Sequence, residues 1–427
     1  MPSSLRRPAL LLLCSYAVSR AQRSLSITGS TLRILHLSDA HFAQASPCLD
    51  MDVDQVAKGA CSSINTTNLL RSAIAIEQPD LIIFTGDVVE KKSDPLQAAM
   101  DEVYGVAVEA GIPFAASLGN HEDGLSMSRT EIAEYVAAKK GALSQLGPVA
   151  GSPGNFYVDL VPPSAASSQC ADAAAAAQRS GGKGQHALDA PCAEHALAAT
   201  PSPAARLVFF DSRKDDVAHS INNAQLDWYG NLTATLPRVP TIALFHLPLP
   251  EYARAAGGTY PPPPANRTLR GFRGEIRIEK PNAAVFPALY AGGVVATFCG
   301  HDHQNDFCKE YEGVQLCYTG VSGFNAFGLC TNEDDANFDD EIPTDGKCMR
   351  RRVKMTELQF GSSASDETVL QSIRSWKRLD GGASVATSSR VGERLLWSAA
   401  GGASTEGERL TGDRLQPASV YSHRPSS

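Results

Sequence analysis

Five short motifs combine carboxylate, amide and imidazole side chains in a pattern suited to chemistry. Each follows an apolar run typical of a β-strand, and side chains beyond the strand ends of an open α/β sheet meet in one crevice. Residues two apart in extended backbone point the same way, so Asp-x-His and His-x-His each present a pair. In chain order, the motifs are Ser38-Asp39-Ala40-His41, Gly86-Asp87, Gly119-Asn120-His121-Glu122, Phe245-His246 and Gly300-His301-Asp302-His303.

These side chains predict a site for two metal ions. All candidate ligands are nitrogen or oxygen donors, a set that suits Fe, Mn or Zn without selecting among them. Asp87 is the candidate bridge, because the two oxygens of a carboxylate can hold cations about 3.5 to 4 Å apart. The candidate ligands are Asp39, His41, Asp87, Asn120, His246, His301 and His303.

Each motif taken alone has a simpler interpretation. A single Asp-x-His or Gly-Asp is common in turns, and a histidine such as His246 after an apolar strand often lies in the core. All five motifs in order, each at a strand end, favour the metal site. The glycines that precede Asp87, Asn120 and His301 are expected to let the chain turn sharply from strand into loop.

Alternating strands and helices are predicted to position the motifs, as in βαβ units with a largely parallel sheet. Residues 65–78 have apolar side chains at helical spacing, and Pro79 ends that helix before the next strand. The end of the domain looks more antiparallel, with a hairpin of residues 307–311 and 314–319. The other expected strands are residues 32–37, 81–85, 112–118, 206–210, 241–245 and 353–360, and the other expected helices are residues 94–110 and 223–236.

The motifs resemble those of the calcineurin-like metallophosphoesterase superfamily over about residues 32–360. Finer matches, to about residue 397, resemble the plant proteins called probable inactive purple acid phosphatases and fungal cell-cycle phosphatases. The resemblance implies an α/β fold, a four-layer sandwich of two central mixed β-sheets flanked by helices, with the metal site at the carboxyl ends of the strands. The finer matches are Asp39-Ala40-His41-Phe42, Cys48 with Cys61, residues 300–308 and Ser375-Trp376-Lys377-Arg378-Leu379-Asp380.

The resemblance also implies a role for each site residue. His121 matches the histidine that contacts the phosphate and assists the leaving group, and Glu122 is a weaker candidate to orient it. The superfamily pattern implies two sets of ligands: Asp39, His41, Asp87 and His303 for a first metal ion, and Asp87, Asn120, His246 and His301 for a second.

One position departs from the purple acid phosphatase pattern. True purple acid phosphatases carry a tyrosine ligand three residues after the bridging aspartate, and Glu90 stands at that position here. We therefore expect no fixed ferric iron. His41 is expected to supply the missing ligand, as in the wider superfamily, so the word inactive need not apply to this chain.

Together these inferences predict a dinuclear-metal hydrolase that acts on a phosphate ester. Two cations lower the pKa of a shared water from 15.7 towards about 7, and the resulting hydroxide would attack phosphorus in line. The expected substrates are phosphomonoesters, either a phosphoprotein or a small metabolite. Two alternatives stay open: a phosphodiesterase, which the same metal core supports, and a catalytically silent secreted glycoprotein that binds metal or phosphate.

The first 21 residues are predicted to be a secretory signal peptide. Arg6 and Arg7 precede an apolar stretch of residues 8–18, and Ser19-Arg20-Ala21 suits cleavage. The apolar stretch is shorter than the about 18 residues that span a bilayer, and no later segment reaches that length. We expect no transmembrane span after signal removal, and a mature protein that is extracellular or vacuolar.

Ten cysteines suit an oxidising compartment, and nine of them follow the predicted signal. Eight of the nine form close sequence pairs that we expect to be disulfides. Cys299 ends an apolar run and is expected to be a buried free thiol. The candidate pairs are Cys48 with Cys61, Cys170 with Cys192, Cys308 with Cys317, and Cys330 with Cys348.

Charge and composition limit the partners and the domain boundaries. A net charge of -8 argues against a nucleic-acid partner, which requires clustered Lys and Arg. Three N-x-Ser/Thr sequons, at Asn65, Asn231 and Asn266, are candidate glycosylation sites. The oligomeric state stays open.

The chain is expected to contain one domain of residues 31–360. Within it, the low-complexity stretch 162–203 is predicted to be an inserted loop, either a lid or surface decoration. Residues 361–397 would pack on the domain as a C-terminal extension, and residues 398–427 would form a disordered tail.

Overall fold

The structure is a computed structural model. It describes residues 23–44, 46–49, 61–90, 93, 95–162, 202–213, 220–257, 276–327, 344–345, 348–363, 365, 367–380, 390–400 and 402–403. The predicted signal peptide, residues 163–201 of the predicted insert and the chain after residue 403 lie outside the described residues. The same is true of Asn266, of the predicted pair Cys170 with Cys192, and of Cys330, the predicted partner of Cys348.

Two seven-stranded mixed sheets form the centre of the molecule. Sheet 1 has the strand order β1-β5-β6-β7-β8-β10-β9, in which β6, β7, β8 and β10 run parallel. Antiparallel pairs join β5 to β6 and β10 to β9. Its strands are β1 (Ser24–Ser26), β5 (Phe156–Val161), β6 (Ala205–Phe209), β7 (Thr241–Leu244), β8 (Val294–Cys299), β9 (Cys308–Tyr311) and β10 (Val314–Tyr318).

Sheet 2 has the strand order β16-β15-β14-β13-β2-β3-β4. The strands β2, β3 and β4 are parallel, whereas β13, β14, β15 and β16 continue the sheet in antiparallel fashion. A separate two-stranded ladder pairs β11 (Thr344–Asp345) with β12 (Cys348–Met349). The strands of sheet 2 are β2 (Thr31–Leu37), β3 (Leu81–Thr85), β4 (Phe114–Ser117), β13 (Arg352–Ser362), β14 (Thr368–Leu379), β15 (Arg390–Ser398) and β16 (Gly402–Ala403).

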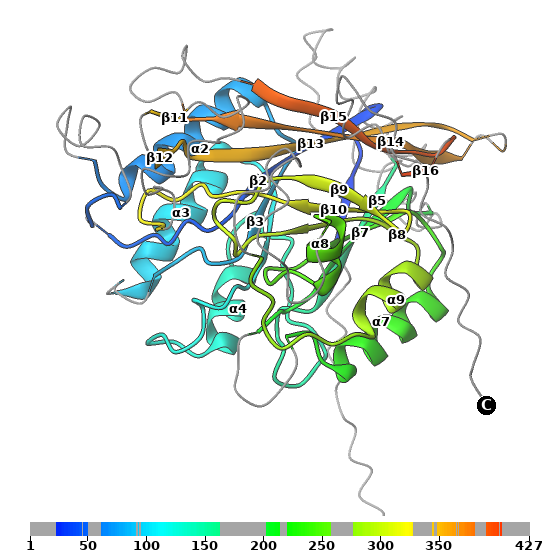
Figure 1. The fold of residues 1–427 in the computed structure, drawn as a ribbon, viewed down its shortest axis with the longest axis horizontal. Helices are drawn as coiled ribbons and strands as arrows, with labels where there is room; N and C mark the ends of the chain where they lie inside the picture. The colour runs from blue at the N-terminus through cyan, green and yellow to red at the C-terminus, as the bar shows by residue number, and fades with distance from the viewer. Residues whose placement is uncertain are drawn as a thin grey trace, which may run out of the picture.

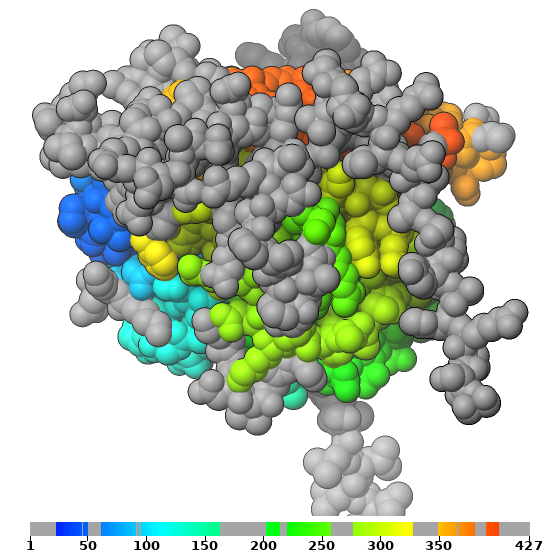
Figure 2. Space-filling view, in the orientation of Figure 1, coloured from blue at the N-terminus to red at the C-terminus, as the bar shows by residue number. Residues whose placement is uncertain are grey.

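Helices cover the outer faces of both sheets, which gives four layers (Figure 1). Sheet 2 packs on α2 and α3, and sheet 1 packs on α7, α8 and α9. Figure 2 shows the α7 to α9 layer, in green to yellow-green, on the face turned toward the viewer. The helices are α2 (Ile64–Glu77), α3 (Leu96–Ala110), α4 (Arg129–Ala137), α7 (Asn223–Thr235), α8 (Pro250–Ala255) and α9 (Val285–Ala291).

Strand periodicity explains the layers. In β2, Ile34 belongs to the core between the two sheets, while Leu35 and Leu37 belong to the core under α2 and α3. Successive side chains of a strand point to opposite faces, so one strand serves both cores. In sheet 1, Leu207 and Val208 of β6 divide in the same way between the inner core and the core under α7 to α9. The predicted four-layer α/β fold is therefore confirmed.

Most predicted elements are present within two residues of their expected ends. The helix expected at residues 65–78 is α2, and the strand expected at residues 81–85 is β3. The predicted hairpin is formed by β9 and β10, with its turn at Glu312 and Gly313. Among the described residues, no helix is long and apolar enough to cross a membrane.

The C-terminal region joins the sheet more closely than expected. Residues 361–397, expected as an extension packing on the domain, contain β14 and most of β15, which lengthen sheet 2 by direct pairing. The tail expected to be disordered from residue 398 begins with an ordered pair, because β16 pairs with the end of β15. The boundary expected at residue 398 therefore falls inside the sheet.

Candidate metal centre

All seven candidate ligands lie just beyond the carboxyl ends of strands. Asp39 and His41 follow β2, Asp87 follows β3, and Asn120 follows β4, which are the three adjacent parallel strands of sheet 2. The remaining ligands follow neighbouring parallel strands of sheet 1, His246 after β7 and the pair His301 and His303 after β8. Loops of both sheets thus meet at one edge of the sandwich.

Four of these residues have a left-handed backbone. The φ angles are 51° at Asp39, 42° at His41, 49° at Asp87 and 76° at His301. A positive φ is uncommon for residues other than glycine and persists only where the surroundings enforce it. Such strain is concentrated at functional sites.

The glycines before the ligands are required for two reasons: a sharp turn, as expected, and the close approach of neighbouring atoms. Gly86 has a φ of 87°, as a sharp turn requires. At Gly119 and Gly300 the reason is close approach instead. A Cβ at Gly119 would overlap the carboxylate of Asp87, and a Cβ at Gly300 would overlap the side chains of Ser38 and Asp39.

The first predicted ligand set converges on one point. Nε2 of His41 lies 3.0 Å from Nε2 of His303 and 3.7 Å from Oδ2 of Asp87. Nε2 of His303 lies 3.5 Å from Oδ1 of Asp39. All four side chains are buried. The ligand atoms of Asp39, His41 and His303 therefore lie within 4.8 Å of one another, and Asp87 lies beside this group through His41.

The second predicted ligand set contains buried atoms without a partner. Nε2 of His246 lies 3.1 Å from Oδ2 of Asp87, and a ligand nitrogen of His301 lies within 4.8 Å of both. Oδ1 of Asn120 and Nε2 of His301 are buried and have no hydrogen-bond partner among the described residues. Buried polar atoms are normally satisfied. These donors therefore fit a cation bound between them.

Asp87 stands between the two sets. Its Oδ2 is near His41 on one side and His246 on the other, while its Oδ1 accepts a hydrogen bond of 2.7 Å from the N–H of His121. Burial disfavours the carboxylate, but the surrounding histidines, led by His246, hold the pKa of Asp87 well below its usual range. This is the position expected of a bridging carboxylate.

Backbone carbonyls fix the orientation of two imidazoles. Nδ1 of His246 lies 2.9 Å from the carbonyl of Thr85, and Nδ1 of His303 lies 2.6 Å from the carbonyl of Phe327. A hydrogen bond from Nδ1–H to a carbonyl leaves Nε2 as the lone-pair donor toward the site. Phe327 had no sequence signal, and its half-exposed ring contacts both His303 and His41.

The buried carboxylates of Asp39 and Asp87 stabilise positive charge inside the site. Burial disfavours the His246 cation, yet Asp87 and Asp39 outweigh burial and raise the pKa of His246 to about 10. Burial and the neighbouring His246 lower the pKa of His301 to about 3, which keeps His301 neutral and able to act as a ligand. Bound cations would supply the same positive charge and leave both imidazoles neutral.

Glu90 is a site residue that the sequence did not identify in this role. Its Oε2 lies 3.0 Å from Nδ1 of His121 and 3.0 Å from Nδ1 of His41. Although burial opposes the His121 cation, Glu90 and Asp87 raise the pKa of His121. The available signal was the position of Glu90, three residues after Asp87, on the same loop.

Glu122 has a different place from the one suggested for it. Its carboxylate accepts hydrogen bonds from the N–H groups of Asp87, Val88 and Gly119, at 3.0, 2.7 and 2.7 Å. It therefore ties the loop after β3 to the loop after β4. The contact that orients His121 comes from Glu90, so the suggestion that Glu122 orients the ring was wrong.

The sequence model of the family described as "calcineurin-like phosphoesterase" matches residues 32–305. This range is more than half of the chain and includes every candidate ligand. The chain belongs to the calcineurin-like phosphoesterase family. Among curated relatives of this phosphoesterase is Arabidopsis thaliana "Probable inactive purple acid phosphatase 14", 27% identical over 404 residues that cover 87% of this chain and 85% of that protein. Saccharomyces cerevisiae phosphatase DCR2 is 22% identical over 380 residues, covering 84% of this chain and 56% of the yeast protein.

Solved structures similar to this phosphoesterase include a dimetal phosphatase from Danio rerio. It is 11% identical, with a TM-score of 0.45, and the alignment covers 84% of this chain and 98% of that one. A purple acid phosphatase from yellow lupin seeds is 13% identical, with a TM-score of 0.38, over 82% of this chain and 52% of that one.

Two of the predicted disulfides are present in this phosphoesterase. Cys48 bonds to Cys61, and Cys308 bonds to Cys317 across the β9–β10 hairpin. Cys299 is free and buried, as predicted. Two of the three sequons are described: Asn231 is exposed on α7, whereas Asn65 is partly buried at the start of α2.

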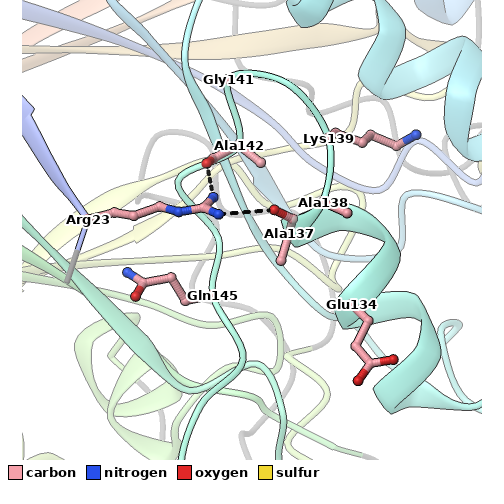
Figure 3. Close-up of a pocket in the computed structure, with 8 residues that line it drawn as sticks. All are labelled: Arg23, Glu134, Ala137, Ala138, Lys139, Gly141, Ala142 and Gln145. Atoms are coloured by element: carbon pink, nitrogen blue, oxygen red, sulfur yellow. Dashed lines mark hydrogen bonds between the residues drawn. The ribbon is translucent and has the colours of Figure 1, made fainter. Parts of the chain in front are cut away.

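A cavity of about 590 Å³ lies apart from the ligand loops of the phosphoesterase, beside α4 (Figure 3). Arg23 reaches into it and donates hydrogen bonds to the carbonyls of Ala137 and Ala142. A cation near the C-terminus of a helix is favourable. This side chain therefore ties the start of the described chain to the end of α4. None of the seven candidate ligands lines this cavity.

Proposed function

We propose that this chain is a metal-dependent phosphomonoesterase that holds two cations in its seven-residue site. The observation that carries the proposal is the convergence of nitrogen and oxygen donors on both sides of Asp87, with the buried Asn120 Oδ1 and His301 Nε2 left without partners among the described residues. Asp39, His41, Asp87 and His303 would hold one ion, and Asp87, Asn120, His246 and His301 the other. When bound, the ions supply hydroxide at neutral pH and neutralise charge on the phosphoryl oxygens.

His121 is proposed to act on the substrate directly. Its side chain is 24% exposed, so a phosphate ester can reach it, and its Nε2 lies 4.0 Å from Oδ2 of Asp87 at the edge of the site. Glu90 raises its pKa against burial, which favours the protonated ring. We propose that this ring donates a proton to the leaving oxygen, and that Glu90 holds the ring in place through Nδ1.

The same residues argue against a silent binding protein. Binding alone does not require an imidazole whose pKa is raised beside the ligands, or a carboxylate that contacts both that imidazole and a ligand. The plant relatives are named inactive purple acid phosphatases. Glu90 stands where active purple enzymes have a tyrosine ligand. Here the Glu90 carboxylate contacts the imidazoles of His41 and His121 instead.

We further propose that the protein matures in the secretory pathway. The two disulfides support an oxidising compartment, because such bonds are rare in reducing ones. Of the two sequons that the structure describes, Asn231 is better placed for a glycan, since it is exposed on α7. Mass spectrometry of protein secreted by a eukaryotic host would identify the mature N-terminus, the bridges and any glycan at Asn231.

Hydrolysis assays test the proposed activity. Purified protein loaded separately with Mn²⁺, Zn²⁺ or Fe²⁺ would be assayed with matched monoesters and diesters of the same alcohols. We expect faster hydrolysis of the monoesters, and loss of that activity on chelation. Faster hydrolysis of diesters would replace the substrate class, and metal uptake without turnover of any ester would leave the silent binding protein as the correct reading.

A further inference from the structure

Two buried arginines outside the candidate ligand set hold the backbone of the ligand loops. Arg129 is the first residue of α4, and Arg352 is the first residue of β13. Their side chains are 6% and 0% exposed. A charged side chain is costly to bury, and a buried arginine is retained only where several partners satisfy it. The partners of these two arginines are therefore informative.

Arg129 joins two loops that carry ligands of the second predicted set. Its terminal nitrogens donate to the carbonyl of Gly119, at 2.7 Å, and to the carbonyl of Ser212, at 3.2 Å. Gly119 directly precedes Asn120. The hydroxyl of Ser212 accepts a hydrogen bond of 2.9 Å from the N–H of His246. One guanidinium therefore connects the loop of Asn120, from sheet 2, with the support of His246, from sheet 1.

An ion pair fixes this guanidinium in place. Nε of Arg129 donates to Oδ1 of Asp211 at 2.8 Å, and Oδ2 of Asp211 accepts from the N–H of Gly154 at 3.0 Å. Burial opposes the cation, but Asp211 reverses this effect and raises the pKa of Arg129. The planar fork of arginine can reach a carboxylate and two carbonyls together, which a lysine ammonium on a flexible stem does less well.

Arg352 holds the backbone at His303, a ligand of the first predicted set, on the loop that also carries His301. One terminal nitrogen donates to the carbonyls of His303 and Gln304, at 3.2 and 3.1 Å. Its Nε lies 2.6 Å from Oδ2 of Asp306, and Oδ1 of Asp306 accepts from Nζ of Lys377 at 2.7 Å. The loop after β8 is thus tied to β13 at His303 and Asp306, and to β14 at Asp306.

We propose that Arg129 and Arg352 are positioning residues that each set the affinity of one of the two cations. Arg129 serves the ion predicted at Asn120 and His246, and Arg352 serves the ion predicted at His303. The proposal rests on the two-ion site of the proposed function. Groups that orient metal ligands contribute about 10- to 100-fold in metal affinity. Replacing either arginine therefore lowers the affinity for one ion by about that factor.

The test measures both dissociation constants rather than activity. Mn²⁺ would be titrated against a competing chelator in the full chain, in wild type, Arg129→Lys and Arg352→Lys. Two reference variants assign each binding step of the titration to one ion. Asn120→Ala removes a ligand of the second ion, and His303→Ala removes a ligand of the first. Electron paramagnetic resonance separates a coupled Mn²⁺ pair from a single ion.

We expect Arg129→Lys to raise by about 10- to 100-fold the dissociation constant of the ion that Asn120→Ala removes. The dissociation constant of the other ion should change less than about threefold. Arg352→Lys should show the reverse. Equal weakening of both ions by each variant, or no weakening, would overturn the inference, since a merely structural arginine has no reason to select one ion. Wild-type protein that binds fewer than two ions would contradict the proposed function and the inference together.

A milder variant covers the case in which a lysine variant does not fold. Ser212→Ala keeps Arg129 and its ion pair but removes the hydroxyl that holds the N–H of His246. It should weaken the same ion as Asn120→Ala and leave the other unchanged. Urea unfolding of metal-free protein checks that the variant is folded, and loss of the wrong ion contradicts the linkage through Ser212.

Discussion

Replacing His121 with alanine separates proton donation from substrate contact. The ring lies 3.0 Å from Glu90 through Nδ1 and 4.0 Å from Oδ2 of Asp87 through Nε2, so it is held beside the ligands without belonging to either predicted set. Two contributions are removed together. A general acid contributes about 10² to 10⁴-fold, and a charged hydrogen bond to phosphate contributes about 1.5 to 3 kcal/mol, or about 10- to 150-fold.

The leaving group distinguishes these contributions. An alkoxide needs a proton as it leaves, whereas nitrophenolate does not. For an alkyl phosphate, His121→Ala removes both contributions, so kcat should fall by the acid's about 10² to 10⁴-fold multiplied by the loss of the contact. For nitrophenyl phosphate only the contact is lost, so the decrease should be smaller by the acid's contribution, about 10² to 10⁴-fold.

The assay measures kcat for both esters at saturating metal, with metal content determined on the same sample. Metal content must stay near that of wild type, since His121 is outside the predicted ligand sets. Equal losses for the two esters would refute proton donation by His121. The residue would then be a phosphate contact only.

Three further predictions concern charge and stability. Glu90→Gln removes the carboxylate that raises the pKa of His121, so the alkaline limb of kcat for an alkyl phosphate should move to lower pH; an unmoved limb would show that Glu90 does not act through this ring. Burial, followed by nearby Lys354, lowers the pKa of His36 from 6.5 to about 3, so below pH 6.5 the unfolded chain binds a proton that the folded chain does not. Metal-free wild type should therefore lose about 2 kcal/mol more stability than His36→Gln between pH 7.5 and pH 5, as measured by urea unfolding; parallel losses would contradict this. The bridge from Cys48 to Cys61 has a sequence separation of 13, so replacing both cysteines with serine should lower the free energy of unfolding by about 3 kcal/mol, and unchanged urea midpoints would exclude that contribution.

The strands, and the place of the candidate ligands at the strand ends, could be predicted from the sequence because both depend on local patterns. An apolar run followed by Gly-Asp or Gly-Asn-His places a polar side chain at a strand end whatever the neighbouring strands are. The parallel order of β2, β3 and β4 then brings Asp39, Asp87 and Asn120 together. Strand alternation in β2 also fixed which side chains face each core.

Contacts between distant segments were not accessible to the sequence. Glu90 reaches His41 from another loop, and Arg129 reaches Ser212 from the other sheet, so neither pair has a local signal. Lys377 of β14 is buried and pairs with Asp306, which follows β8 in the other sheet. No local pattern indicates such a pair.

Helix α4 was missed despite a local signal. The hydroxyl of Ser128 accepts a hydrogen bond from the N–H of Glu131, and the carboxylate of Glu131 accepts one from the N–H of Ser128, which is a capping box. The helix is only 9 residues long and its apolar face is short, so hydrophobic periodicity gave little indication of it. The Ser-x-x-Glu spacing would have located its start.

The central claim is that Asp87 bridges two cations that the activity requires, and metal analysis of Asp87→Asn tests it most directly. Elemental analysis and hydrolysis would be measured on the same samples of wild type and variant. We expect close to two metal ions per chain in wild type. The variant should lose metal and activity together, because an amide replaces one oxygen of the bridge. Asp87→Asn protein with two ions and wild-type activity would contradict the account.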